Sequence, residues 1–242
     1  MTVPVSGHDD SEPRNKLRML CLHGYEQDSN VLRTKLKHHM AALQNKVDFV
    51  FETAPNILHP YDIDGMDNVT RAEATRTGKT LGKTFRGWYF LKSADPEIID
   101  GLENSIEHLV AVLEEQGPFD GMLGFSQGGL MTAIMCSLLE HRYKQLGDQC
   151  THAPFKFAII SSGYKLKDTR WQYLYEKPIS TPSLHIYGVL DSMIHVSKSI
   201  ELKHTFAHAT EYCFVGTHFV PKTPEAIETI SEFIAKFTNA DE

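Results

Sequence analysis

Residues 119–132 read FDGMLGFSQGGLMT: the end of an apolar strand, a serine flanked by glycines, and the start of an apolar helix. Within this stretch, residues 124–128 (GFSQG) match the pattern G-x-S-x-G. In a nucleophile elbow the chain turns from strand to helix so tightly that glycine must flank the serine, whose hydroxyl then stands clear of the sheet. The N-terminus of the following helix favours negative charge beside Ser126. The alternative interpretation is an ordinary strand-to-helix turn that contains a serine by chance.

Short apolar runs and helical patterns alternate along the rest of the chain. Strands are expected over six short runs, each bounded by glycine or proline: residues 17–22, 47–52, 119–124, 157–161, 183–187 and 211–215. The clearest helical spacing covers residues 96–116 (with Asp95 as N-cap), 128–139 and 224–237. This alternation predicts the α/β class, with a mostly parallel central sheet of about six strands and helices on both faces. Together with the elbow pattern at Ser126, it predicts an α/β-hydrolase fold. The usual order of such a sheet is 2-1-3-4-5-6, with Ser126 at its carboxyl edge.

Domain boundaries follow from the polarity of the chain. Residues 1–16 are polar and are expected to form a flexible N-terminal tail. Residues 17–238 are expected to form a single serine hydrolase domain, because no linker interrupts the alternation. Residues 56–87 lack clear periodicity and include four glycines. A loop of this length is usually functional, so this segment is expected to form a lid or a pocket wall.

The composition is that of a globular protein and argues against several functional classes. The chain has 242 residues, with 24 Lys and Arg against 31 Asp and Glu, for a net charge of −7. An acidic chain does not attract a phosphate backbone, so nucleic-acid binding is not expected. No apolar run approaches the roughly 18 residues of a membrane helix, and the polar N-terminus lacks the apolar core of a signal peptide. The expected location is the cytoplasm, with the nucleus as the alternative.

No residue pattern indicates a metal site or an organic cofactor. The chain contains four cysteines: Cys21, Cys136, Cys150 and Cys213. None has CxxC or metal-binding spacing, and all but Cys150 lie in apolar stretches, where reduced and buried thiols are expected. His204 and His208 stand four residues apart in an expected helix that begins near His195, but the Glu of H-E-x-x-H is missing. No metal and no cofactor is therefore expected.

Chain order selects the partners of the serine. A serine hydroxyl needs a base, and the base needs an acid to orient it. In α/β-hydrolases these residues follow one another as Ser, then Asp or Glu, then His. His218 lies between the sixth expected strand and the last helix, where a base can reach Ser126. Asp191, in the tight loop after the fifth strand, is the preferred acid, and Asp168, after the fourth, is its rival.

Two backbone N–H groups are expected to form the oxyanion hole. One belongs to Gln127, the residue after the nucleophile, and the other to Tyr25, in the loop after the first strand. Gly24 beside Tyr25 allows the close backbone approach that this hole requires. His23 precedes the serine in the chain and is interpreted as a structural histidine bonded to the backbone of its own loop.

Further segments make the chain similar to a known family. It resembles the FSH family of serine hydrolases from about residue 17 to residue 237. The segments that carry the resemblance are LHG at 22–24, RGWY at 86–89, GPFDG at 117–121 leading into GFSQG at 124–128, IYG at 186–188 with Asp191, and His218 with VP at 220–221. The resemblance implies a Ser126–Asp191–His218 triad, esterase or thioesterase activity on acyl substrates, and a place for Arg86 and Trp88 near the site.

The expected function is hydrolysis of carboxylic esters of small acyl substrates through this triad and an acyl-enzyme intermediate. An acyl thioesterase is the alternative within the same chemistry, and a non-catalytic binding module on the hydrolase fold is the alternative from another class. The acyl pocket is expected to be apolar and lined by Trp88, Phe125, Met193 and Phe219. For Trp88 the alternative is packing in the core. The sequence leaves the oligomeric state open.

Overall fold

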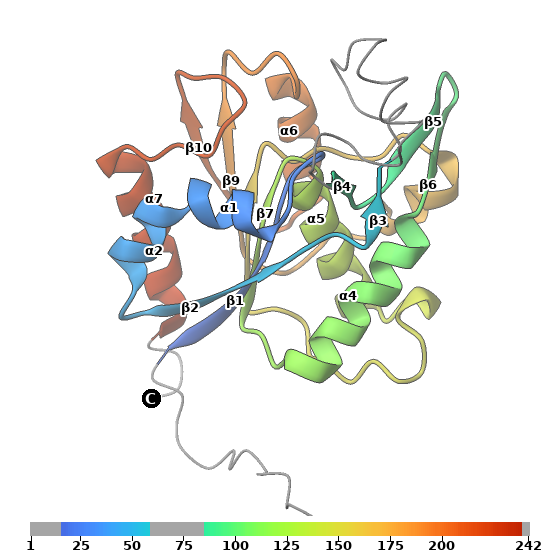
Figure 1. Cartoon of the computed structure of the whole chain (residues 1–242), viewed down its shortest axis with the longest axis horizontal. Coiled ribbons are helices and arrows are strands. Elements are labelled where there is room, and N and C mark those ends of the chain that lie inside the picture. The colour runs from blue at the N-terminus through green and yellow to red at the C-terminus, as the bar shows by residue number, and fades with distance from the viewer. Residues whose placement is uncertain (1–15, 59–84, 239–242) are drawn as a thin grey trace, which may run out of the picture.

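The six expected strands lie side by side in one sheet, as the computed structural model shows for residues 16–58 and 85–238 (Figure 1). They are β1 (Leu17–Leu22), β2 (Val47–Glu52), β7 (Gly121–Phe125), β8 (Phe157–Ser161), β9 (Ser183–Gly188) and β10 (Ala209–Phe214). All neighbouring pairs are parallel, in the order β10-β9-β8-β7-β1-β2. Numbered along the chain, this is the predicted order 2-1-3-4-5-6. The predicted fold class is confirmed.

Side chains of the central strands alternate between two cores. On β1, Met19 and Cys21 pack into one apolar cluster, whereas Leu20 and Leu22 pack into the other. Successive side chains of a strand point to opposite faces, so a sheet that is buried on both faces requires an uninterrupted apolar run. This requirement explains why residues 19–22, after the half-buried Arg18, are all apolar.

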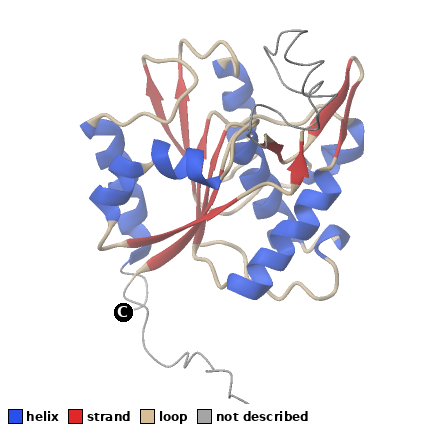
Figure 2. Cartoon of the chain, viewed as in Figure 1, coloured by secondary structure: helices blue, strands red, loops and turns tan. Residues whose placement is uncertain are grey.

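Helices cover both faces of the sheet (Figure 2). On one face lie α1 (Ser29–Lys35), α2 (Lys37–Leu43) and α7 (Pro224–Thr238). On the other lie α4 (Leu102–Gln116), α5 (Gln127–His141), α6 (Val196–Lys203) and two short 3₁₀ helices, η2 (Lys144–Leu146) and η3 (Thr169–Tyr175). Helix α5 is buried on every side from Gln127 to Leu139, as its uniformly apolar sequence predicts. It fixes the residue at its N-terminus firmly against the sheet.

The helix predicted over residues 96–116 starts later than expected. Its first residues instead form β6 (Glu97–Asp100), which pairs in an antiparallel hairpin with β5 (Phe90–Ala94). Ile98 is exposed and Ile99 is buried, which is the alternation of a strand. Gly101, with φ +82°, then separates strand from helix and replaces Asp95 as the N-cap of α4. Because two adjacent isoleucines fit either period, the sequence pattern alone did not separate the two structures.

Two further expectations about local structure need correction. Helix α6 ends at Lys203, so His204 is its C-cap and His208 lies beyond it. The two histidines therefore do not share a helix face. Cys213 is exposed rather than buried, because β10 is the edge strand of the sheet. No helix within residues 16–58 and 85–238 is long and apolar enough to cross a membrane.

A short antiparallel ladder closes the base of the segment predicted as a lid. It joins β3 (Asn56–Ile57) to β4 (Arg86–Gly87). The buried Asn56 side chain fastens this base, since its Nδ2 donates hydrogen bonds to the carbonyl oxygens of Gly87 and Trp88 at 3.1 Å each. Residues 59–84, and residues 1–15 of the expected tail, lie outside the described residues.

Candidate active site

Ser126 stands in a strained turn between β7 and α5. Its backbone has φ +55° and ψ −117°, a conformation that residues with a side chain rarely adopt. A Cβ atom on Gly124 would lie 2.0 Å from the carbonyl oxygen of Gly128, and one on Gly128 would lie 2.2 Å from that of Leu22. Both flanking positions of the motif therefore exclude any residue larger than glycine, which is the geometry predicted for a nucleophile elbow.

The side chains of Ser126, His218 and Asp191 form a continuous chain of hydrogen bonds. Ser126 Oγ lies 3.0 Å from His218 Nε2, and His218 Nδ1 lies 2.7 Å from Asp191 Oδ2. The other carboxylate oxygen of Asp191 accepts hydrogen bonds from the backbone N–H groups of Met193 and Ile194, at 2.9 and 2.8 Å. These bonds fix the buried carboxylate, so it can hold the imidazole in one orientation.

Three strand ends bring these residues together. Ser126 follows β7, Asp191 follows β9, and His218 follows β10, all at the carboxyl edge of the parallel sheet. The loops after β9 and β10 are also joined to each other, since Leu190 N–H donates to the carbonyl oxygen of Gly216 at 2.9 Å. The parallel topology thus assembles a site from residues that are up to 92 positions apart.

Asp168, the rival acid, has a different environment. Its carboxylate accepts hydrogen bonds from the side chain of Arg170 and from the backbone N–H of Ile99, at 2.6 and 3.0 Å for the closest contacts. The Arg170 guanidinium holds the pKa of Asp168 at about 2. Asp168 is the N-cap of η3 and fastens it to β6. The geometry favours Asp191 as the partner of His218.

His23 is buried in the loop after β1 and is bonded on both ring nitrogens. Its Nδ1 donates to the Gly24 carbonyl oxygen at 2.7 Å, and its Nε2 accepts from Ala54 N–H at 2.9 Å. Burial lowers the pKa of His23 to about 4, so the ring is neutral. This matches its interpretation as a structural histidine. His195, by contrast, is exposed and is the N-cap of α6.

The two segments expected to form the oxyanion hole lie against each other. Gln127 is the first residue of α5. A Cβ atom on Gly24 would lie 3.3 Å from Ser126 Cβ and 3.1 Å from the Phe125 ring, so the backbone before Tyr25 runs directly beside the elbow. The close approach expected at Gly24 is therefore present.

A bridge between these segments has no clear signal in the sequence. The Gln127 side chain accepts a hydrogen bond from Trp88 N–H at 2.7 Å and donates one to the Tyr89 carbonyl oxygen at 2.8 Å. The indole N–H of Trp88 in turn donates to the His23 carbonyl oxygen at 2.8 Å. We call Gln127, Trp88 and His23 the elbow bridge. It ties the elbow to the loop after β1 through the segment that follows β4.

The four residues predicted to line an acyl pocket separate into two pairs. Trp88 is fully buried in the core, where its indole N–H is satisfied, so the alternative of core packing holds and its assignment as a pocket-lining residue is corrected. Phe125 is also buried, with its ring 4.9 Å from that of His218. Met193 and Phe219 are exposed at the carboxyl edge, at 61% and 40%. Other exposed apolar side chains of the same two loops are Val189, Leu190 and Val215.

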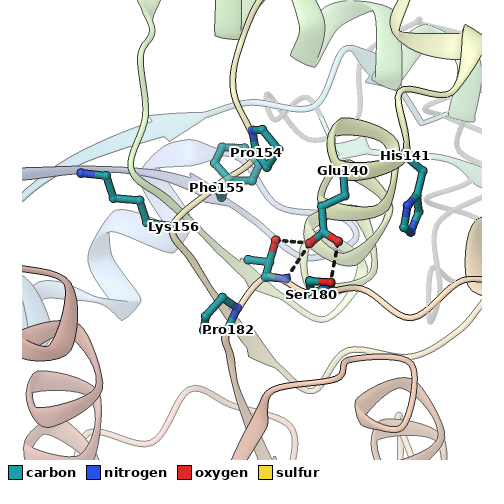
Figure 3. Close-up of a pocket in the computed structure, with 8 residues that line it drawn as sticks. Glu140, His141, Pro154, Phe155, Lys156, Ser180 and Pro182 are labelled. Carbon is teal, nitrogen blue, oxygen red and sulfur yellow. Dashed lines mark hydrogen bonds between the residues drawn. The ribbon is translucent and has the colours of Figure 1, made fainter. Parts of the chain in front are cut away.

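A hollow lies at the end of α5 opposite to Ser126, beside Glu140 (Figure 3). The Glu140 carboxylate accepts hydrogen bonds from the backbone N–H groups of Ser180 and Thr181, at 2.7 and 2.5 Å. It therefore anchors the loop that leads into β9, a structural role far along α5 from Ser126. Among the described residues, no three His, Cys, Asp or Glu side chains gather as a metal site requires.

A parallel sheet of this strand order, with an elbow serine at its carboxyl edge, defines the α/β-hydrolase class. Comparison with known proteins narrows the class. Residues 12–230 match the family described as "Serine hydrolase (FSH1)", and the chain belongs to that family. It is therefore a serine hydrolase.

Relatives and solved structures agree with this membership. The chain is 34% identical over 230 residues to "Esterase OVCA2" of Danio rerio, covering 91% of this chain and 97% of the relative. It is 29% identical over 231 residues to "Esterase OVCA2" of Homo sapiens, covering 91% and 96%. The fold is similar to that of Zea mays acyl-protein thioesterase 2, with a TM-score of 0.64, 15% identity and coverage of 94% and 96%.

Proposed function

We propose that the protein is a serine esterase that cleaves carboxylic esters of acyl substrates through Ser126, Asp191 and His218. The observation that carries this proposal is the hydrogen-bond chain from Ser126 Oγ to His218 at 3.0 Å and from His218 to Asp191 at 2.7 Å. The relatives named as esterases support the choice of an ester bond.

In the first half of the reaction, His218 Nε2 accepts the Ser126 proton while Oγ attacks the ester carbonyl carbon. Negative charge develops on the carbonyl oxygen, and the N–H groups of Tyr25 and Gln127 stabilise it. The resulting imidazolium donates its proton to the leaving alcohol as the C–O bond breaks. An acyl group then remains on Ser126, and Asp191 holds the imidazole orientation throughout.

In the second half, His218 accepts a proton from water, and the hydroxide attacks the acyl-enzyme carbonyl. Collapse of the second tetrahedral intermediate releases the carboxylic acid and returns the proton to Ser126. The described triad needs no metal or cofactor for either half, since proton transfer and nucleophilic attack use its own side chains.

A thioester substrate is the second candidate. The same triad attacks a thioester carbonyl, and a structural neighbour named as an acyl-protein thioesterase supports this candidate. A non-catalytic binding module is the remaining alternative. The serine in a strained turn, hydrogen-bonded to a His–Asp pair, argues against this alternative, because ligand binding alone does not require such an arrangement.

The test combines covalent labelling with a matched substrate pair. A fluorophosphonate probe should label the wild-type protein and the Ser180→Ala control, which alters an exposed serine remote from the elbow, but not Ser126→Ala. Oxygen esters and thioesters of the same acyl chain then separate the two activities by kcat/KM. Absence of labelling in wild-type protein would favour the binding module, and a preference for the thioester would make the protein a thioesterase.

A further inference from the structure

A hollow of about 380 Å³ lies beside the catalytic histidine. Its walls come from the junction of α1 and α2 and from the loop that follows His218. The residues that line it include Lys35, Lys37, His38, Phe219, Val220 and Lys222. We call this the lysine hollow.

The lysine hollow is strongly basic on an acidic protein. Three of its lining residues are lysines and none is acidic, whereas the whole chain has a net charge of −7. Lys35, Lys37 and Lys222 form no ion pair within residues 16–58 and 85–238, although lysines elsewhere in that part, such as Lys92 and Lys156, pair with aspartates. Unpaired ammonium groups around one hollow attract an anion, because nothing in its wall neutralises them.

Several contacts join the lysine hollow to the triad. The Lys35 ammonium lies 5.5 Å from the centre of the Phe125 ring, and that ring lies 4.9 Å from the ring of His218. A single aromatic ring therefore separates this lysine from the imidazole. His39 Nε2 donates to the Pro221 carbonyl oxygen at 2.9 Å, which fastens α2 to the loop carrying Phe219. The hollow is thus held at a fixed place beside the base.

The position of the hollow indicates which part of a substrate would reach it. In acyl transfer, the imidazolium protonates the leaving group, so the leaving group lies on the histidine side of the nucleophile. The lysine hollow lies on that side, since Phe219 and Val220 directly follow His218. Its occupant is therefore expected to belong to the alcohol or thiol part of the substrate rather than to the acyl chain.

We propose that the lysine hollow binds an anionic group, a carboxylate or a phosphate, carried by the leaving alcohol or thiol of the substrate. Three lysines supply separate point charges, which suit such an anion without demanding the planar geometry of an arginine pair. The exposed ring of Phe219 contacts the apolar stem that links the anion to the ester. This inference rests on the proposed esterase function of Ser126.

The test compares two esters that differ in the charge of the leaving group. The butyrate esters of 4-hydroxyphenylacetate and of 4-hydroxyphenylacetamide share the acyl chain and a phenol leaving group insulated from the charge by a methylene. The wild-type protein should prefer the anionic ester by about tenfold in kcat/KM, with less preference at high salt. Inorganic phosphate at constant ionic strength should inhibit hydrolysis of the anionic ester competitively.

Lysine variants locate the effect. Lys222→Gln should lower the anionic-to-neutral ratio about threefold, and combining it with Lys35→Gln and Lys37→Gln should bring the ratio near one. The control, Lys144→Gln with Lys177→Gln, changes exposed lysines at the far end of α5 and should keep the wild-type ratio.

Each other outcome has a distinct meaning. Equal hydrolysis of both esters by wild-type protein, or a ratio that survives in the triple lysine variant, would overturn the anion site alone. Phosphate inhibition without a preference for the anionic ester would assign the hollow to a free anion and overturn a substrate-borne one. Hydrolysis of neither ester would overturn the esterase proposal itself.

Discussion

At the scale of single residues, the hydroxyl of Ser126 is kept from its usual role at a helix start. An N-cap serine ordinarily accepts a hydrogen bond from the backbone of the first turn. Ser126 occupies the N-cap of α5 but makes no such bond, because its φ of +55° turns the side chain away from the helix. Its Oγ instead reaches His218. The strain, on the order of 1–3 kcal/mol for such a conformation, is offset by the surrounding sheet and helix.

Replacing the nucleophile tests this residue directly. Ser126→Ala should lower kcat for ester hydrolysis by about 10⁴-fold or more, since triad members act as a unit. The fold should persist, because the alanine methyl group occupies less space than the side chain it replaces. Steady-state kinetics and thermal unfolding measure the two effects. Comparable turnover by the alanine variant would exclude Ser126 as the nucleophile.

The two candidate acids should differ in what their loss affects. Asp191→Asn should reduce kcat by about 10³-fold or more, because an amide cannot stabilise the imidazolium or hold its tautomer. Asp168→Asn should leave kcat within a few-fold but lower the Tm by several degrees, at about 2–4 °C per kcal/mol, because Arg170 and the Ile99 N–H lose a charged partner. If the two variants exchange effects, Asp168 is the acid.

At the scale of elements, the elbow bridge joins three segments that lie far apart in the sequence. The start of α5, the loop after β1 and the segment after β4 are linked by hydrogen bonds of Gln127, Trp88 and His23, all buried. The bridge holds the two expected oxyanion donors, Gln127 and Tyr25, on elements that cannot move separately. Preorganised donors of this kind stabilise developing charge without reorganisation.

Cutting the bridge should lower both activity and stability. Gln127→Ala leaves the Trp88 N–H and the Tyr89 carbonyl oxygen buried without their partner, which costs about 2–4 kcal/mol. The loosened oxyanion segment should lower kcat by roughly tenfold or more. Denaturant unfolding and kinetics at saturating ester measure these changes, with Gln44→Ala, an exposed glutamine, as the matched control. An unchanged kcat would mean that the bridge only supports the fold.

At the scale of the whole molecule, buried histidines make stability depend on pH. Burial lowers the pKa of His23 to about 4 and that of His185 to about 3, and it also lowers the pKa of His39 and His152. Each of these rings stays neutral to a lower pH in the folded protein than in the unfolded chain, where a histidine binds a proton below about pH 6.5. The unfolded state then binds more protons, so the free energy of unfolding falls as the pH decreases.

This loss should be visible between about pH 6.5 and pH 4 as a falling urea midpoint. The slope should approach 1.4 kcal/mol per pH unit for each buried histidine that titrates on unfolding. His185→Gln should flatten the dependence by one such proton. Stability that is constant down to pH 5 would contradict neutral burial of these rings. Below pH 4, protonation of Asp168 should add a further loss, since its pKa is about 2.

Local signals in the sequence were sufficient to predict the strands of the sheet and the tight turn at Ser126. The six strands follow from their apolar runs, and their order is the one usual for an α/β-hydrolase sheet, which the structure confirms. The glycines around Ser126 indicate the turn because only glycine fits there. Chain order together with placement in strand-end loops selected Asp191 and His218, and these two residues lie in hydrogen-bonding contact. Their catalytic roles stay predictions.

The sequence by itself therefore determined the six strands, the tight turn at Ser126 and the choice of partners for the serine, because each depends on nearby residues or on position at a strand end. Only the tertiary structure decided how long-range contacts use the remaining residues. The sequence predicts Trp88 as a pocket-lining residue, but it lies in the core, where its indole N–H donates to the His23 carbonyl oxygen. The sequence predicts Ile99 in a helix, but it pairs with β5 in a hairpin. The lysine hollow likewise unites α1, α2 and the loop after β10. Contacts between distant segments leave no period in the sequence, since they depend on packing in three dimensions.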